Sequence, residues 1–404
     1  MLERRTLLTM AASAGFVPAA PAILRAQETA GVTATEILIG NTMPYSGPAS
    51  AYGTIGKAIA AAFQMANDAG GFAGRKVKFI SYDDGYSPPK TVEQTRRLIE
   101  EDKVAALFAP LGTPTNSATV RYVNQKKVPH LFLATGADKW GDYQDHPWTI
   151  GFQPSYVTEA QVYSKYIMAQ NPDSKIGCLY QNDDFGKDYL RGLRDILKSR
   201  YDRQVTTASY EVTDSTIDSQ LVTLQAAGID VLMTIASPKF AAQTIRRVAG
   251  MNWKPMHIMT GVSASVGAVM IPAGAENGIG IISSLYGKDP TDPAWGDDPG
   301  LKQWRAFMAK YYPDGDLKDG GNAVGYGMTY TMAAVLRNCG NDLSRENIMK
   351  QATNLHDAEN PILLPGIRIN TSPTNYRPIR QLQLIRWTGT QWDRFGDIIA
   401  GADA

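Results

Sequence analysis

Residues that often carry out catalysis are present in this sequence, but their spacing does not assemble a catalytic motif. Four histidines lie far apart and lack the spacing of metal ligands: His130, His146, His257 and His356. In the stretch GVSASVG, the residue two positions after Ser263 is Ser265 rather than glycine, so it is not the nucleophile elbow of a hydrolase. We therefore expect no enzyme and no metal site.

Two glycine-rich stretches are incomplete nucleotide-binding motifs. GGFAGRK lacks the spacing and the Lys-Ser/Thr ending of a phosphate loop, and GIGII near Gly278 lacks the third glycine of a dinucleotide fingerprint. Lys and Arg total 40 against 39 for Asp and Glu, and no long basic block occurs. Nucleic acid is therefore a poor candidate partner, and no cofactor is expected.

The start of the chain, MLERRTLLTMAASAGFVPAAPAILRAQ, indicates export. The pair Arg4-Arg5 precedes an uncharged run from Thr6 to Leu24, and Ala26 offers a small residue at which cleavage could occur. The order Arg-Arg-Thr-Leu-Leu also resembles the twin-arginine export motif.

A transmembrane anchor is the alternative interpretation, because the uncharged run approaches the ~20 residues that span a bilayer. Its small residues and two prolines, Pro18 and Pro21, argue against a spanning helix. We predict a cleavable export peptide over residues 1–26 and a mature chain in the periplasm.

The two cysteines lie in different kinds of segment. Cys178 sits in the strand-like run KIGCLYQ, and Cys339 ends the helix-like run AAVLRNCGND. An exported protein could join them in a bridge, but this placement favours two separate thiols.

Short apolar runs alternate with amphipathic stretches of helical length from Glu36 onward. EILIGNTMP, KVKFISYDD and VAALFAP have the character of buried strands, and PPKTVEQTRRLIEED that of a helix. Between the first two strands, apolar residues follow helical spacing: Ile55, Ile59, Ala62, Phe63 and Ala66. Strands separated by helices predict βαβ units and a parallel sheet.

The same order of elements recurs about 130 residues later, in QVTTASYEVTDSTIDSQLVTLQAAGIDVLMTIASPKFAAQTI. A chain of 404 residues also exceeds what one core usually supports. We therefore expect two α/β lobes whose strand ends line a shared cleft. The expected crossing points between them are near Thr149–Gly151, Ser283–Tyr286 and Leu364–Gly366.

Several stretches together resemble one family. ILIGNTMPYSGPASAYG, ANDAGGFAGRKVKFISYDDGYSPPKTVEQTRRLIEED, NDDFGKDYLRGL and AAGIDVLMTIASP occur in the order found in periplasmic solute-binding proteins of ABC importers of the leucine/isoleucine/valine-binding type. YGKDPTDPAWGDDPGLKQW and LLPGIRINTSPTNYRPIRQLQLIRW are similar to one branch of that family, for which aromatic carboxylates are the suggested ligands.

The resemblance implies the type I periplasmic binding protein fold, with two Rossmann-like lobes, a three-stranded hinge and a ligand cleft between the lobes. On this basis the first lobe comprises residues 27–149 and 286–363, and the second comprises 150–285 and 364–404. The implied partners are a small carboxylate and the membrane permease subunits of an importer, and the chain is expected to be a monomer. A ligand-sensing receptor module of the same fold is the alternative.

The resemblance also implies that first-lobe hydroxyl and N–H groups hold the ligand carboxylate. The matching loops are PLGTPTN, with Thr113 and Pro114, and LATGADKW, with Thr135, Gly136 and Ala137. The first of these loops also begins a helix, where free N–H groups and the helix dipole favour an anion. Helix capping is the alternative role for the threonines, and the register at Thr113-Pro114 is open by one residue.

Four further positions match family contacts to the ligand: Tyr52, Phe185, Ser237 and Val262. The stretch 261–263 offers no acidic residue to pair with a ligand ammonium, and a buried unpaired ammonium is costly. We therefore favour an amine-free acid, aromatic or otherwise, over a free amino acid. Trp140 and Tyr326 either help to enclose the ligand or pack at the cleft rim and in a helix interface.

Overall fold

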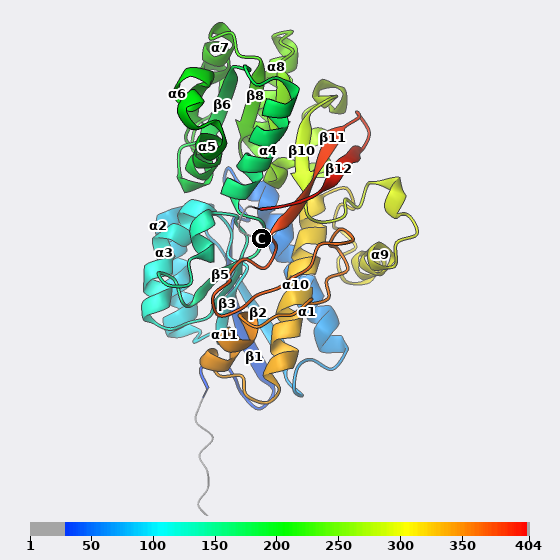
Figure 1. The fold of residues 1–404 in the computed structure, drawn as a ribbon. Coiled ribbons are helices and arrows are strands. Elements are labelled where there is room, and N and C mark those ends of the chain that lie inside the picture. Colours follow the sequence, from blue (N-terminus) through cyan, green and yellow to red (C-terminus); the bar gives the residue numbers. More distant parts are fainter. Residues whose placement is uncertain (1–28, 402–404) are drawn as a thin grey trace, which may run out of the picture.

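The computed structural model describes residues 29–401, which form two α/β lobes that lie one above the other in Figure 1. The predicted export peptide, residues 1–26, lies outside the described residues. The first lobe contains a five-stranded parallel sheet with the order β2-β1-β3-β4-β5. Its strands are β1 (Glu36–Met43), β2 (Lys76–Asp83), β3 (Ala106–Phe108), β4 (His130–Leu133) and β5 (Thr149–Gly151).

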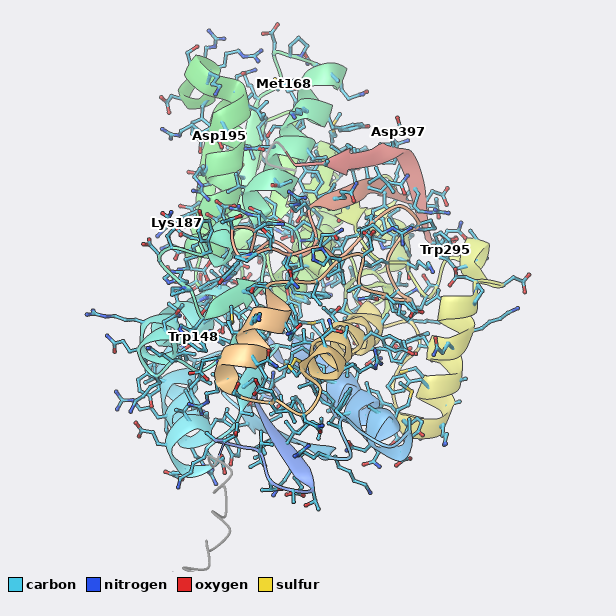
Figure 2. The ribbon with its side chains drawn as sticks, turned by 60° about the horizontal axis from the view of Figure 1, so that its bottom comes forward. Trp148, Met168, Lys187, Asp195, Trp295 and Asp397 are labelled. Carbon is cyan, nitrogen blue, oxygen red and sulfur yellow. The ribbon has the colours of Figure 1, made fainter. Side chains whose placement is uncertain are left out.

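The second lobe contains a seven-stranded sheet with the order β12-β11-β10-β9-β8-β6-β7. It is parallel from β7 to β10, and the last two strands add an antiparallel edge. Figure 2 labels Asp397 on this outer hairpin. The strands are β6 (Ile176–Gln181), β7 (Val205–Tyr210), β8 (Val231–Ile235), β9 (Met256–Met259), β10 (Ile282–Leu285), β11 (Gln381–Trp387) and β12 (Trp392–Ala400).

Helices alternate with the strands along the chain and lie beside both sheets. Because helices cover a parallel sheet, its inner strands are apolar throughout, and β8, with the sequence VLMTI, is buried at every residue. The helices are α1 (Gly53–Asp68), α2 (Pro88–Arg96), α3 (Thr113–Gln125), α4 (Tyr156–Gln170), α5 (Asp184–Leu197), α6 (Tyr201–Gln204), α7 (Asp218–Ala226), α8 (Pro238–Gly250), α9 (Pro299–Tyr311), α10 (Gly320–Cys339) and α11 (Arg345–Ala352).

Helix α1 buries the face that the sequence spacing predicts. Ile55, Ile59 and Phe63 are buried in it, and the helix packs against α10. A Cβ on Gly325 of α10 would lie 2.5 Å from the Ile55 carbonyl oxygen, so glycine allows the two helix backbones to approach closely.

The repeated order of elements predicted from the sequence is confirmed. The first lobe contains β2, α2, β3 and α3 in succession, and the second lobe contains β7, α7, β8 and α8. In each lobe the loop after the inner strand leads directly into a helix that starts at the side facing the other lobe.

The third crossing between the lobes lies later in the chain than we predicted. The chain enters the second lobe after β5 and leaves it after β10, close to the predicted points. However, Ile367, Ile369 and Ile379 are buried in the core of the first lobe, so the chain does not cross at 364–366. It crosses just before β11, because the irregular segment ahead of that strand buries its isoleucines against the first sheet.

The two cysteines lie in different lobes, Cys178 on β6 and Cys339 at the end of α10. Both are buried and free, which confirms the prediction of two separate thiols. Among residues 29–401, no helix is both long and apolar enough to cross a membrane.

Candidate functional site

A cavity of about 180 Å³ lies between the two lobes. Its size is sufficient for one small organic molecule, since a cavity of about 150 Å³ can hold benzene. The first lobe contributes side chains that include Tyr52, Tyr86, Thr113 and Phe152. The second lobe contributes Tyr156, Glu159, Phe185, Ser237 and Val262.

The first-lobe wall presents polar groups where α3 begins. Gly112 has a φ of +102°, and a Cβ at this position would lie 2.5 Å from the Tyr86 ring, so only glycine fits here. In the first turn of α3, the N–H of Thr113, which lines the cavity, donates to no backbone carbonyl of the described residues. Together with the helix dipole, such N–H groups favour an anion.

The Thr113 hydroxyl is oriented by Thr135. The two hydroxyl oxygens are 2.6 Å apart, and Thr135 Oγ1 also accepts from the Ala137 N–H at 3.3 Å and from Trp140 Nε1 at 3.5 Å. Either hydroxyl of this pair could be the donor. The two N–H groups that approach the Thr135 oxygen favour Thr135 as the donor to Thr113. The Thr113 proton is then free to point at an acceptor in the cavity.

The second predicted loop lies behind this wall and does not line the cavity. Thr135, Gly136, Ala137 and Trp140 instead surround a smaller pocket beside Arg377. Trp140 is 2% exposed and packs in the second-lobe core cluster. The loop therefore supports Thr113, and Trp140 takes the packing role that the sequence left open.

Two further predicted residues lie away from the cavity. Pro114 occupies the first turn of α3, where its missing N–H removes no helical hydrogen bond. Tyr326 is buried in α10 with its ring 4.6 Å from that of Phe307 on α9, and its hydroxyl donates to Tyr330. Of its two proposed roles, Tyr326 takes the one in the helix interface.

The remaining predicted residues meet in the cavity. Tyr52 donates from its hydroxyl to the Val262 carbonyl, 3.4 Å away in the other lobe. Phe185 packs its ring 4.9 Å from the Tyr156 ring. Ser237 is 2% exposed, and its Oγ has no hydrogen-bond partner among the described residues.

The lining residues that sequence reasoning missed include Tyr86, Tyr156 and Glu159. Tyr86 follows β2, and the other two lie in the first turn of α4, directly after a crossing that the sequence did reveal. The position of Tyr156 and Glu159 directly after a crossing is the sequence feature that could have identified these two residues. Burial raises the pKa of Tyr86 and of Tyr156, so both hydroxyls stay protonated and can donate hydrogen bonds.

Glu159 corrects one expectation. The loop 261–263 has no acidic residue of its own, but Glu159 Oε1 accepts from the Gly261 N–H at 2.7 Å. The same oxygen accepts from Tyr163 at 2.6 Å and from Ser284 at 3.0 Å. The expectation considered only the loop 261–263, which has no acidic residue, whereas helix α4 supplies a carboxylate from outside that loop.

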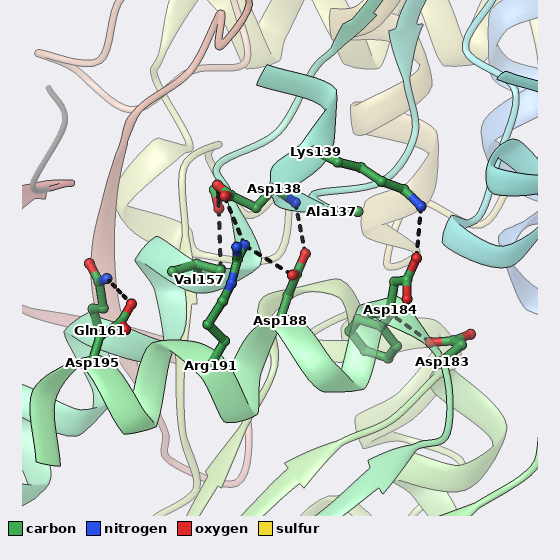
Figure 3. A network of polar contacts seen from close by, with 12 residues as sticks. Ala137, Asp138, Lys139, Val157, Gln161, Asp183, Asp184, Asp188, Arg191 and Asp195 are labelled. Atoms are coloured by element: carbon green, nitrogen blue, oxygen red, sulfur yellow. Dashed lines mark hydrogen bonds and ion pairs between the residues drawn. The ribbon is translucent and has the colours of Figure 1, made fainter. Parts of the chain in front are cut away.

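Ion pairs join the lobes along one rim of the cleft, as Figure 3 shows. Lys139 of the first lobe contacts Asp184 of α5 at 2.7 Å, and Arg191 of α5 contacts Asp138 at 2.8 Å. The Asp138 N–H also donates to Asp188 of α5 at 2.7 Å. The start of α5 is thus held against the 138–139 turn.

The other rim is joined by fewer contacts. Ser265 donates to Asp319 at 3.0 Å, and the Gly267 N–H donates to the Lys318 carbonyl at 2.8 Å. With contacts on both rims, the lobes enclose the cavity in a closed arrangement.

Comparisons with known proteins agree with this architecture. A family model described as periplasmic binding protein matches residues 36–391. A protein named Leu/Ile/Val-binding protein homolog 7 from Brucella abortus is 24% identical over 296 residues, which cover 70% of this chain and 73% of that protein.

Solved structures share the fold. A branched chain amino acid ABC transporter protein from Thermus thermophilus with bound valine has a TM-score of 0.81 and 14% identity, covering 91% of this chain and 97% of that one. An ABC transporter solute binding protein from R. palustris in complex with benzoate has a TM-score of 0.76 and 19% identity, covering 91% and 98%.

Proposed function

The chain belongs to the periplasmic binding protein family, and from this premise we propose that it captures a small carboxylate in the periplasm for the permease subunits of an ABC importer. Its relatives are of the leucine/isoleucine/valine-binding type. Like them, it binds a ligand rather than converting one.

The Thr113 end of the cavity is the observation that carries the proposed carboxylate. The Thr113 hydroxyl and the N–H at the start of α3 meet there, in a wall that also contains aromatic side chains. Lys288 also lines the cavity, but its ammonium already contacts both oxygens of Asp298 and the Pro361 carbonyl. The Thr113 end is therefore better suited to hold an anion than Lys288 is.

The body of the ligand is proposed to be apolar and preferably aromatic. Tyr52, Tyr86, Phe152, Tyr156 and Phe185 surround the cavity, and ligand pockets of this kind gain most of their affinity from apolar burial. The R. palustris protein of the same fold is in complex with benzoate. Aromatic carboxylates without an amine are therefore the preferred candidate ligands.

A branched-chain amino acid is the second candidate ligand, and one observation favours it. Glu159 brings a carboxylate to the 261–263 loop, where it could pair with an ammonium. The Thermus thermophilus protein, which has bound valine, shows that the fold accommodates such a ligand.

We picture one chain, acting as a monomer without a cofactor, closing on one ligand. The anion binds the first lobe, the second lobe swings in through the three crossings, and the permease recognises the closed form. A sensor that reports to a membrane partner would close in the same way. Genes for permease and ATPase subunits beside this one would favour transport.

The test is a thermal-shift screen of the mature protein, residues 27–404. Benzoate and related aromatic acids, short aliphatic acids, leucine and valine are each added at high concentration. A ligand present at one hundred times its Kd adds about 2.7 kcal/mol of stability, which a thermal shift detects. We expect aromatic acids to stabilise the protein most. Stabilisation by none of these compounds would contradict the proposal.

A further inference from the structure

A cluster of charged side chains joins the two lobes at the start of α5, and Figure 3 shows its arrangement. Asp138 and Lys139 come from the first lobe, and Asp184, Asp188 and Arg191 come from the second. We call these five residues the α5 rim cluster. Three of its members are carboxylates and two are cations, so the contact between the lobes is sensitive to the charge of each acid.

Asp188 has weaker cationic support than Asp138 within this cluster. Asp138 contacts two arginines, Arg191 and Arg377, each at 2.8 Å. In the described part of the chain, Asp188 forms an ion pair with Arg191 alone, at 3.1 Å. The guanidinium nitrogen in that pair is the one that also contacts Asp138. Asp188 therefore shares its cation with a second acid.

The closed arrangement of the lobes buries Asp188. Its side chain is 15% exposed, and its Oδ2 accepts from the backbone N–H of Asp138 at 2.7 Å, across the boundary between the lobes. Opening on this rim would separate α5 from the 138–139 turn and return the carboxylate to water. The environment of Asp188 therefore depends on whether the lobes are closed.

The elements packed against this part of α5 bring several charged groups. They are Asp138 and Lys139 of the turn, Arg377 beside Asp138, Glu159 of α4, and Asp184 and Arg191 of α5 itself. Helix α3 presents the neutral Ser117, which accepts from Lys139 at 2.7 Å. The carboxylate of Glu159 accepts from Gly261 and does not pair with this cluster.

Burial and nearby negative charges both disfavour an ionised carboxylate. Burial is the main cause that raises the pKa of Asp188 from 3.8 to about 6, and the charges of Asp138 and Asp184 add to it, although Arg191 opposes them. Once the lobes open and water reaches the side chain, the pKa should fall back towards its ordinary value. The closed form therefore binds this proton more tightly than the open form does.

We propose that the α5 rim cluster is a proton-sensitive latch, in which Asp188 takes up a proton from solvent as the lobes close on the ligand. This inference rests on the proposed function, in which the lobes close around a small carboxylate. The favourable effect of the proton on closure is fully present below about pH 4 and is lost as the pH rises through about 6. The protein should therefore hold its ligand more tightly in mild acid than at neutral pH.

Calorimetric titration of the mature protein at pH 6, in two buffers of different ionisation enthalpy, counts the protons taken up on binding. Benzoate and leucine are the probes, because neither changes its own charge near this pH. The unmodified protein should take up about half a proton per ligand bound, since the closed form is half protonated there and the open form is not. Its affinity for benzoate should rise about fivefold from about pH 7.5 to about pH 5.

Asp188→Asn keeps an oxygen that can accept from the Asp138 N–H, but its side chain does not titrate. This variant should take up less than about 0.1 proton per ligand at pH 6 and bind benzoate equally at both pH values. Asp195→Asn is the matched control, because Asp195 is an exposed carboxylate on the same helix, and it should keep the full uptake. The proton count on the unmodified protein tests the inference even if Asp188→Asn does not fold.

Binding without proton uptake by the unmodified protein would overturn the inference and leave the proposed function standing. Uptake that persists in folded Asp188→Asn would assign the proton to another group and overturn the inference as well. If neither benzoate nor leucine binds the unmodified protein at any of these pH values, the proposed function fails, and the inference fails with it.

Discussion

At the scale of single residues, the direction of one hydrogen bond decides what the first-lobe wall can bind. The Ala137 and Trp140 N–H groups approach the Thr135 oxygen and favour Thr135 as the donor to Thr113, a direction that leaves the Thr113 proton for the cavity. The sequence led to both threonines through a family resemblance but could not assign their separate roles. Those roles depend on Trp140, whose indole N–H reaches Thr135 only in the folded chain.

Thr113→Val should weaken the binding of a carboxylate ligand by about tenfold to a hundredfold. The variant keeps the shape but loses a hydrogen bond to a charged group, which contributes about 1.5–3 kcal/mol. Calorimetric titration measures the loss. Thr223→Val is a control on the exposed face of α7, and it should bind as the unmodified protein does. Equal affinities of both variants would refute the role of Thr113.

At the scale of elements, alternating apolar runs were sufficient to predict the strands and helices that carry the cleft. The repeated order around β2 and β7 was visible because each inner strand is a short apolar run bounded by polar loops. The third crossing was misplaced because residues 367–379 have no regular pattern, and their isoleucines are buried by tertiary packing alone. Glu159 was missed for a similar reason, since its contact with Gly261 joins residues far apart in the chain.

Helix α5 carries a titrating group of the interlobe contact, which gives a pH prediction. Burial raises the pKa of Asp188 from 3.8 to about 6. A raised pKa means that the folded protein holds this proton more tightly than the unfolded chain does. The resulting contribution to stability is fully present below about pH 4 and is lost as the pH rises through about 6.

Asp188→Asn removes this titration. Relative to the unmodified protein, the variant should gain about 1–3 kcal/mol in unfolding free energy between pH 4 and pH 7. Urea unfolding at the two pH values measures the difference, and Asp195→Asn, on the exposed side of α5, is the control. The same offset at both pH values would show that Asp188 does not titrate in this range.

At the scale of the whole molecule, the two lobes are held closed by ion pairs on one rim, by a few hydrogen bonds on the other, and by one further ion pair, Arg394 to Asp292 at 3.7 Å. Exposed ion pairs contribute little, typically below about 1 kcal/mol. In the proposed clamp, closure would therefore depend mainly on the ligand, which would contact both walls at once. This balance would let the proposed clamp open again and release its ligand.

Lys139→Met should weaken ligand binding by less than about fivefold, because it removes only one exposed pair across the rim. Lys302→Met is a matched control, since Lys302 forms an ion pair of 2.8 Å with Asp297 within one lobe, and it should leave the affinity unchanged. Titration at low salt measures both effects. A loss of a hundredfold in Lys139→Met would mean that the ion pairs, and not the ligand, hold the lobes together.

Titration of the mature protein with benzoate and with benzamide tests the central claim most directly. The two molecules have nearly the same size and ring, but only benzoate carries an anionic group for Thr113 and the start of α3. We predict one benzoate bound per chain, with benzamide at least tenfold weaker. Equal binding of benzamide would contradict a carboxylate site at Thr113.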